Sequence, residues 1–176
     1  MNHLLHAGRE QLTKGELKKA VSTLSPIATY FSDSLEGQMS LGEAHRASGQ
    51  REAALGCFQK AVTLAASTKK AGGESRILPL LIRSVKTPSD PAVLDAFAGR
   101  YELKPDSITT VVRQGHRLVI QSPTGQWSTL VPDSAITFRL LENPSVLCEF
   151  TLDDERRART LLIRSGGQDL MHKKLQ

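Results

Sequence analysis

The residues best suited to chemistry in this sequence do not assemble into a complete catalytic pattern. Ser67-Thr-Lys-Lys matches the S-x-x-K spacing of a serine nucleophile and its lysine. The sequence has neither the Tyr-x-Asn nor the Lys-Thr-Gly motif that would complete this pattern. It also lacks a G-x-S-x-G elbow, a phosphate-binding loop and a dinucleotide fingerprint. We therefore interpret the S-x-x-K match as a coincidence and expect no enzymatic activity and no cofactor.

The histidines and cysteines do not point to a metal site. His3 and His6 share one face of a predicted helix but belong to no familiar zinc-ligand pattern. Cys57 and Cys148 lie far apart, each among apolar neighbours, so we expect two separate buried thiols. Unpaired cysteines suit a reducing compartment.

The first half contains an internal repeat with a period of about 34 residues. One fixed offset superimposes small or apolar residues in five pairs: Gly8/Gly42, Gly15/Gly49, Ala20/Ala54, Leu24/Phe58 and Ile27/Ala61. Small residues at the first and third pairs allow two antiparallel helices to approach closely. Glycine is favoured just after the end of a helix, so Gly15 and Gly49 predict where the first helix of each repeat ends.

This pattern resembles the tetratricopeptide (TPR) repeat. Leu41-Gly42, Gly49, Ala54, Phe58 and Ala61 carry the resemblance in the second copy, and Ala7-Gly8, Gly15 and Ala20 carry it in the first. The resemblance implies helical hairpins at 1–34 and 35–68 whose first helices line a concave face that binds a peptide or a partner protein. On this chain the face would present Asn2, Leu5, Arg9, Leu12, Glu36, Met39, Glu43 and Arg46. The Lys and Asn pairs of a carboxylate clamp are missing, so a general protein contact and a purely structural repeat both stay open.

The remainder of the first half predicts a capping helix and a linker. The apolar segment 74–84 is long enough for a helix over the second repeat, with Pro79 either in its first turn or at a kink. Gly72-Gly73 before it is a turn signal, and Thr87-Pro-Ser-Asp-Pro is rich in residues that break regular structure. We therefore predict a helical domain over 1–86 and a second domain over 91–176.

The charge is unevenly divided between these halves. Residues 1–86 contain 12 Lys and Arg against 7 Asp and Glu, whereas residues 87–176 contain 11 of each. An excess of this size could attract an acidic partner. The alternative is that the basic residues are scattered over a solvated helical surface and bind nothing. No dense basic stripe with interleaved aromatic residues is present, so we expect no nucleic-acid partner.

The sequence predicts neither membrane insertion nor export. It contains no apolar run of the roughly 18–20 residues that span a bilayer, and its first residues do not form a secretory signal. We expect a cytoplasmic protein, or a periplasmic or secreted one if the chain is part of a longer exported hydrolase.

The second half predicts an antiparallel β-domain. A short helix near 92–98 leads into Gly99, and brief runs of β-branched and aliphatic residues then alternate with turns. The predicted strands are 99–103, 108–113, 117–121, 127–132, 135–140, 146–152, 160–164 and 169–175. Eight such strands predict a closed barrel or half-barrel, so the whole chain is expected to be α+β with segregated domains.

Residues 91–176 resemble the lipocalin-like C-terminal domain of many bacterial serine β-lactamase-like hydrolases and related peptidases. The segments that carry the resemblance include Leu94-Asp-Ala-Phe-Ala-Gly-Arg-Tyr-Glu-Leu, Arg117-Leu-Val-Ile-Gln and Gly167-Gln-Asp-Leu. Asp153-Asp-Glu-Arg-Arg departs from the tight Asp-x-x-Gly turn of that family. The resemblance implies an accessory domain that packs against a catalytic domain. We expect its interior to be filled by side chains, with Trp127 as a candidate ligand contact.

Three functions remain open after this reading. The first is a non-enzymatic interaction module in which the helical groove binds a partner protein and the β-domain packs on it. The second is the accessory part of a serine β-lactamase-like hydrolase without its catalytic domain. The third is a small-molecule-binding barrel.

Overall fold

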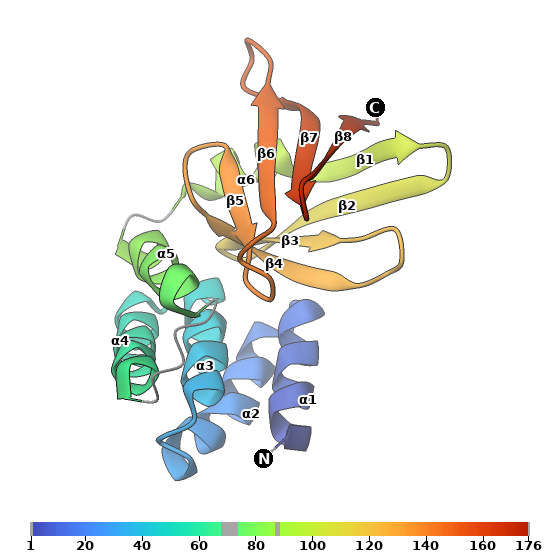
Figure 1. Ribbon diagram of the computed structural model, residues 1–176. Coiled ribbons are helices and arrows are strands. Elements are labelled where there is room, and N and C mark those ends of the chain that lie inside the picture. Colours follow the sequence, from blue (N-terminus) through green and yellow to red (C-terminus); the bar gives the residue numbers. More distant parts are fainter. Residues whose placement is uncertain (1, 68–73, 87–88, 176) are drawn as a thin grey trace. The chain divides into compact units, whose positions relative to one another are not determined.

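The computed structural model describes residues 2–67, 74–86 and 89–175, with only the backbone at residues 2, 74 and 75. The chain divides into two compact units, Met1–Pro88 and Ser89–Gln176. The described part of the first unit is helical, and the second unit contains a closed antiparallel barrel (Figure 1). The α+β class with segregated parts is therefore confirmed. The predicted turn at Gly72-Gly73 and the start of the predicted linker, residues 87 and 88, lie outside the described residues.

The helical unit is a series of antiparallel helices, each packed on the next (Figure 1). Its helices are α1 (Asn2–Thr13), α2 (Leu17–Tyr30), α3 (Leu35–Ala47), α4 (Arg51–Ser67) and α5 (Glu74–Lys86). α5 packs on α4, in the place where the sequence predicts a capping helix, and Pro79 lies inside it. Arg51 at the start of α4 donates hydrogen bonds to the backbone oxygens of Val85 and Lys86, which ties α4 to the last turn of α5.

The two helical hairpins turn in the same way. Gly15 and Gly49 both have φ of 76°, a left-handed conformation in which a side chain would be strained. The N–H of Glu16 bonds to the oxygen of Gln11 at 2.9 Å, and the N–H of Gln50 bonds to the oxygen of His45 at the same distance. Together with the N–H of each glycine, these bonds cap the last turn of α1 and of α3 in the Schellman arrangement. The 34-residue repeat of the sequence is therefore matched by a repeat of the same helix-ending turn in the backbone.

A close helix–helix contact repeats with the same period. A Cβ placed on Gly8 of α1 would lie 2.5 Å from Cγ of Leu24 on α2. A Cβ placed on Gly42 of α3 would likewise lie 2.5 Å from Cε1 of Phe58 on α4. Leu24 and Phe58 are completely buried, so each hairpin is held together by a large side chain that fills the space above a glycine.

The barrel is an eight-stranded meander. Its strands are β1 (Gly99–Lys104), β2 (Ser107–Gln114), β3 (Arg117–Gln121), β4 (Trp127–Pro132), β5 (Thr137–Leu140), β6 (Leu147–Leu152), β7 (Ala158–Ser165) and β8 (Gln168–Lys174). Each strand pairs with the next, and β1 pairs with β8 through Tyr101↔Lys174 and Glu102↔Lys173. All eight predicted strands are present.

Strand β7 begins earlier than the sequence suggests. Pairing between β6 and β7 extends to Leu152↔Ala158, and a tight turn from Asp153 to Arg157 joins the two strands. Arg156 adopts φ of 59° in this turn, at the place where an Asp-x-x-Gly turn has its glycine. The hairpin therefore closes tightly without glycine.

An aromatic cluster fills one part of the barrel interior. Helix α6 (Pro91–Phe97) precedes β1, and Phe97 at its end packs against Phe138 and Phe150 with ring centroids 5.3 and 4.8 Å apart. The hydroxyl of buried Tyr101 donates a hydrogen bond of 2.6 Å to the backbone oxygen of Phe97, which fixes α6 to β1. Burial raises the pKa of Tyr101, so this hydroxyl keeps its proton.

Candidate functional site

The barrel contains a cavity of about 370 Å³. Its apolar wall is formed by Leu103, Ile120, Leu140, Val146, Ile163 and Leu170. Ser107, Ser122, Gln126, Ser128 and Ser165 add hydroxyl and amide groups. Asp, Glu, Lys and Arg are absent from the described residues that line the cavity.

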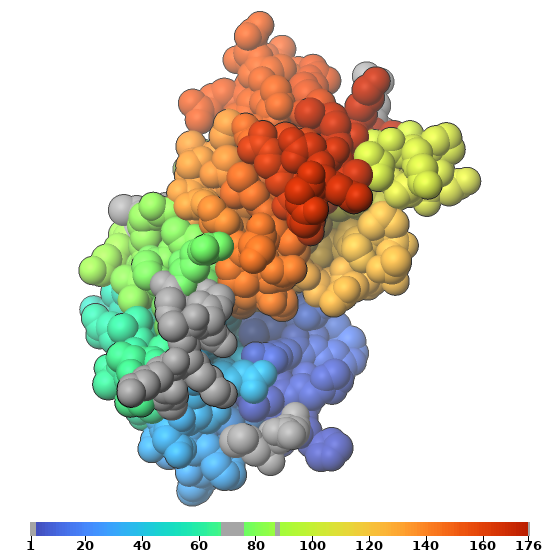
Figure 2. Space-filling view, in the orientation of Figure 1, coloured from blue at the N-terminus to red at the C-terminus, as the bar shows by residue number. Residues whose placement is uncertain are grey.

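The cavity lies at the end of the barrel formed by four hairpin turns. In an antiparallel meander, alternate turns meet at the same end. The lining residues Ser107, Ser122, Gln126 and Ser165 lie beside the β1–β2, β3–β4 and β7–β8 turns. Figures 1 and 2 show the tips of the β1–β2 and β3–β4 hairpins, in yellow-green and light orange, next to each other. The helix α6 leads into the start of β1, and therefore lies toward the opposite end.

The expectation of a filled interior therefore holds for one part of the barrel only. The core around Phe97, Phe138 and Phe150 is tightly packed by aromatic rings. Toward the hairpin end most of the lining residues are aliphatic or small, and they leave the cavity between them. A small-molecule site needs such a concave and mostly apolar space with a few polar groups.

Three buried side chains with polar or ionisable atoms line the cavity: Thr109, Cys148 and His172. They are 1%, 0% and 2% exposed. Burial raises the pKa of the Cys148 thiol to about 12, so the thiol stays protonated and unreactive. His172 Nδ1 lies 3.1 Å from the backbone oxygen of Leu170. A carbonyl oxygen only accepts hydrogen bonds, so Nδ1 carries the hydrogen in this contact.

Sequence reasoning did not identify Thr109 or His172, and it predicted Cys148 only as a buried thiol. The signal that could have found Thr109 and His172 is strand alternation, because Thr109 is two residues from buried Val111 and His172 is two residues from Leu170, which also lines the cavity. Alternation places a residue inside a barrel but does not tell whether side chains or a cavity surround it.

Trp127, the candidate ligand contact, lies at the start of β4. It is half-buried and pairs with Gln121 of β3. Its neighbours Gln126 and Ser128 line the cavity, while Trp127 is not among the described residues that do so. Trp127 is the only tryptophan of the chain, so it serves as a natural fluorescent probe of the barrel unit.

The face predicted to bind a partner is partly exposed. Arg9 of α1 and Glu36 of α3 form an ion pair of 2.6 Å, with side chains 51% and 58% exposed. Arg9 also donates a hydrogen bond of 3.0 Å to the hydroxyl of Ser40 on α3. The first helices of the two hairpins are therefore joined by polar contacts on an accessible surface. Met39 of α3 is half-buried, and the side chain of Asn2 lies outside the described residues.

Two other predicted contacts lie in the core. Leu5 and Leu12 of α1 are 4% and 5% exposed and belong to a cluster with Leu24 and Ile27 of α2. Their seven-residue spacing puts them on the same helix face as Gly8, which contacts α2. These leucines hold the hairpin together and are not available to a partner.

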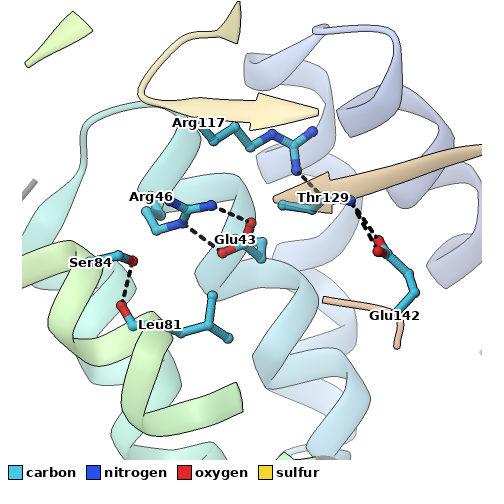
Figure 3. Close-up of polar contacts among 7 residues, drawn as sticks. All are labelled: Glu43, Arg46, Leu81, Ser84, Arg117, Thr129 and Glu142. Carbon is cyan, nitrogen blue, oxygen red and sulfur yellow. Dashed lines mark hydrogen bonds and ion pairs between the residues drawn. The ribbon is translucent and has the colours of Figure 1, made fainter. Parts of the chain in front are cut away.

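Glu43 and Arg46 form a buried ion pair. Their side chains are 2% and 6% exposed, and the guanidinium donates hydrogen bonds of 2.7 and 3.0 Å to the two carboxylate oxygens (Figure 3). The three-residue spacing on α3 allows this two-pronged contact. Reversing the charge of Arg46 would therefore damage the fold and would not test partner binding.

Other side-chain bonds shown in Figure 3 stabilise the two units separately. In the barrel unit, Arg117 of β3 donates a hydrogen bond of 3.1 Å to the hydroxyl of Thr129 on β4. The N–H of Thr129 donates to Glu142, which follows β5, at 3.0 Å. In the helical unit, the hydroxyl of Ser84 donates to the oxygen of Leu81 within α5 at 2.8 Å. These contacts have a structural role.

The remaining candidates for chemistry do not form a site. Ser67 donates a hydrogen bond of 2.9 Å to the backbone oxygen of Leu64 on an exposed part of α4, and the rest of the S-x-x-K match lies outside the described residues. Within the described ranges, His, Cys, Asp and Glu nowhere gather into a group that could hold a metal ion. Within the same ranges, no helix is long and apolar enough to cross a bilayer.

Comparisons with known proteins give no further assignment. Neither a protein-family model nor a curated protein matches the sequence.

Proposed function

We propose that this protein is a non-enzymatic interaction module, in which a TPR-like helical unit binds a partner protein and a lipocalin-like barrel acts as an accessory domain. The observation that supports the proposal best is the period of the helical hairpins. The glycine turn, and the contact between a glycine and a large buried residue, both recur in the second hairpin as they stand in the first. Stacked helical repeats of this kind present extended surfaces that suit protein recognition.

The proposed contact surface lies around Arg9 and Glu36. These side chains belong to the first helices of the two hairpins and are exposed. Their ion pair brings both charged groups together on one accessible surface, where a partner could contact them.

An acidic segment is the favoured partner chemistry. The first 86 residues have an excess of five positive charges, and this excess arises within residues 51–86, which hold seven Lys and Arg against two Asp and Glu. Lys60, Arg76 and Arg83 are exposed on α4 and α5. The resulting field would attract an acidic protein segment and speed its association.

The resemblance of residues 91–176 suggests what kind of protein carries this segment. Barrels of the resembled family accompany catalytic domains of serine β-lactamase-like hydrolases. A catalytic domain of that kind, from a bacterial source, is therefore the first partner that we would test.

The test is a charge-swapped variant, Arg9→Glu/Glu36→Arg. The swap keeps an ion pair between α1 and α3 but reverses its direction, so the helical unit should stay folded while a partner loses its complementary surface. Captured proteins would be identified by mass spectrometry, with circular dichroism at 222 nm as the folding control. A partner retained by the native chain and lost by the folded swap supports the proposal. A partner retained equally by both chains contradicts the proposed surface.

A further inference from the structure

The barrel cavity has the size of a small-molecule site. Its volume of about 370 Å³ falls within the roughly 300–1,000 Å³ of ligand pockets. At the volume of liquid water per molecule, this space corresponds to about a dozen waters. A ligand that displaces water from walls such as Ile120, Val146 and Ile163 gains the hydrophobic free energy of burying apolar surface.

The lining favours an uncharged ligand. Asp, Glu, Lys and Arg are absent from the described lining residues, so a carboxylate or an ammonium group would lose its hydration without the ion pair that one of these side chains could provide. The polar groups of the lining include the neutral hydroxyls of Ser107 and Ser128. An uncharged molecule therefore fits the electrostatics of the cavity.

His172 selects the polar group of the ligand. Its Nδ1 hydrogen is engaged by the oxygen of Leu170, so in the neutral ring Nε2 is a hydrogen-bond acceptor. Among the described residues, Nε2 has no hydrogen-bond partner, although the side chain is 2% exposed and lines the cavity. A ring nitrogen without a protein partner on a cavity wall can accept a hydrogen bond from a donor on the ligand.

We propose that the cavity binds an uncharged, mostly apolar small molecule with a hydroxyl group, and that His172 Nε2 accepts the hydrogen of this hydroxyl. The ligand enters between the hairpin turns that carry Ser122, Gln126 and Ser165. Its apolar body lies along the aliphatic wall, and its hydroxyl is directed toward β8. This site goes beyond the proposed partner binding and does not depend on it, because all lining residues belong to the barrel unit.

The first experiment measures occupancy of the cavity. Uncharged N-phenyl-1-naphthylamine is titrated into the full chain, and its fluorescence reports transfer into an apolar environment. Ser128→Phe fills the cavity from β4, whereas Thr151→Phe places the same ring on an exposed position of β6. We expect saturable binding by the native chain and by Thr151→Phe, and at least a tenfold loss for Ser128→Phe.

A second blocking variant is included in case Ser128→Phe does not fold. Ser165→Phe lies at the exposed end of β7 and blocks the mouth with less strain on the core. Near-ultraviolet circular dichroism establishes that each variant is folded. Absence of saturable probe binding to the native chain overturns the proposal, and so does full binding by both folded blocking variants.

The second experiment measures the role of His172. The probe is displaced by 1-naphthol or by naphthalene, which differ only in the hydroxyl. We expect 1-naphthol to bind about 2- to 10-fold more tightly than naphthalene, which is the usual effect of one hydrogen bond, and we expect His172→Phe to abolish this difference. A preference for 1-naphthol that persists in His172→Phe, or equal binding of both compounds to the native chain, overturns the assigned hydroxyl contact.

Discussion

The substitution Gly42→Ala should weaken the helical unit, although alanine is the better helix former. A Cβ on this residue would lie 2.5, 2.7 and 3.0 Å from three ring atoms of Phe58. Contacts that short require the ring or the two helices to move apart. Phe58 is completely buried, so the ring has no free space into which it could turn.

The expected magnitude follows from two opposing effects. Overpacking a tight core costs about 1–3 kcal/mol. Replacing glycine by alanine within a helix returns about 0.8–1 kcal/mol through the backbone. We therefore expect the free energy of unfolding of the helical unit to fall by about 0.5–2 kcal/mol.

Gly56→Ala is the matched control. Gly56 lies inside α4, and a Cβ added there would meet nothing within 4 Å. The same substitution should therefore raise the stability by about 0.5–1 kcal/mol. The two variants are expected to have opposite signs.

The assay is urea unfolding followed by two signals. Ellipticity at 222 nm reports mainly on the helices, while Trp127 fluorescence reports on the barrel unit, which contains the only tryptophan. Both variants should shift the ellipticity transition and leave the fluorescence transition in place. Equal stabilisation by Gly42→Ala and Gly56→Ala would refute the close approach of α3 and α4.

Three further predictions concern a buried charge, a strained turn and an alkaline pH. Glu43→Gln should lower the free energy of unfolding of the helical unit by about 3–5 kcal/mol, because the Arg46 charge stays buried without its ion pair. An unchanged midpoint of urea unfolding, followed by ellipticity at 222 nm, would contradict this. Arg156→Gly should stabilise the barrel by about 0.5–1 kcal/mol, since a non-glycine residue in a left-handed turn is strained; a loss of stability would contradict the turn geometry. The Cys148 thiol has a folded pKa of about 12 against an ordinary 9.0, so it stabilises the barrel fully below pH 9, and this contribution is lost as pH rises toward 12. Unfolding monitored by Trp127 should therefore occur at lower urea above pH 9, and less steeply in Cys148→Ala; identical pH profiles would exclude this role.

The helical hairpins could be predicted because their signals are local. Glycine ends a helix through its own backbone conformation, so Gly15 and Gly49 mark turns wherever the rest of the chain lies. The strands could be predicted for a similar reason, because a turn such as Ser165-Gly-Gly interrupts β-branched runs at short and regular intervals.

Which of the predicted contact residues are exposed could not be predicted, because exposure depends on non-local packing. The four-residue spacing along α1 makes Leu5 and Arg9 look equivalent, yet Leu5 packs in the core and Arg9 is exposed. The cavity depends on the balance of side-chain volumes across the barrel. Phe97, which fills one part of the interior, comes from α6 and belongs to no strand.

The closure of the barrel has a consequence for how it folds. Every strand pair except one joins neighbours in sequence, so those ladders can form by short-range zipping. The seam between β1 and β8 joins Tyr101 to Lys174, from the first and the last strand of the barrel, and is its shortest ladder. Bringing these ends together costs the most loop-closure entropy, so the seam should form last. The amides that bond across the β1–β8 pairing should exchange hydrogen before those of the other ladders. Local opening of the native barrel should therefore separate β1 from β8 and leave the remaining ladders paired.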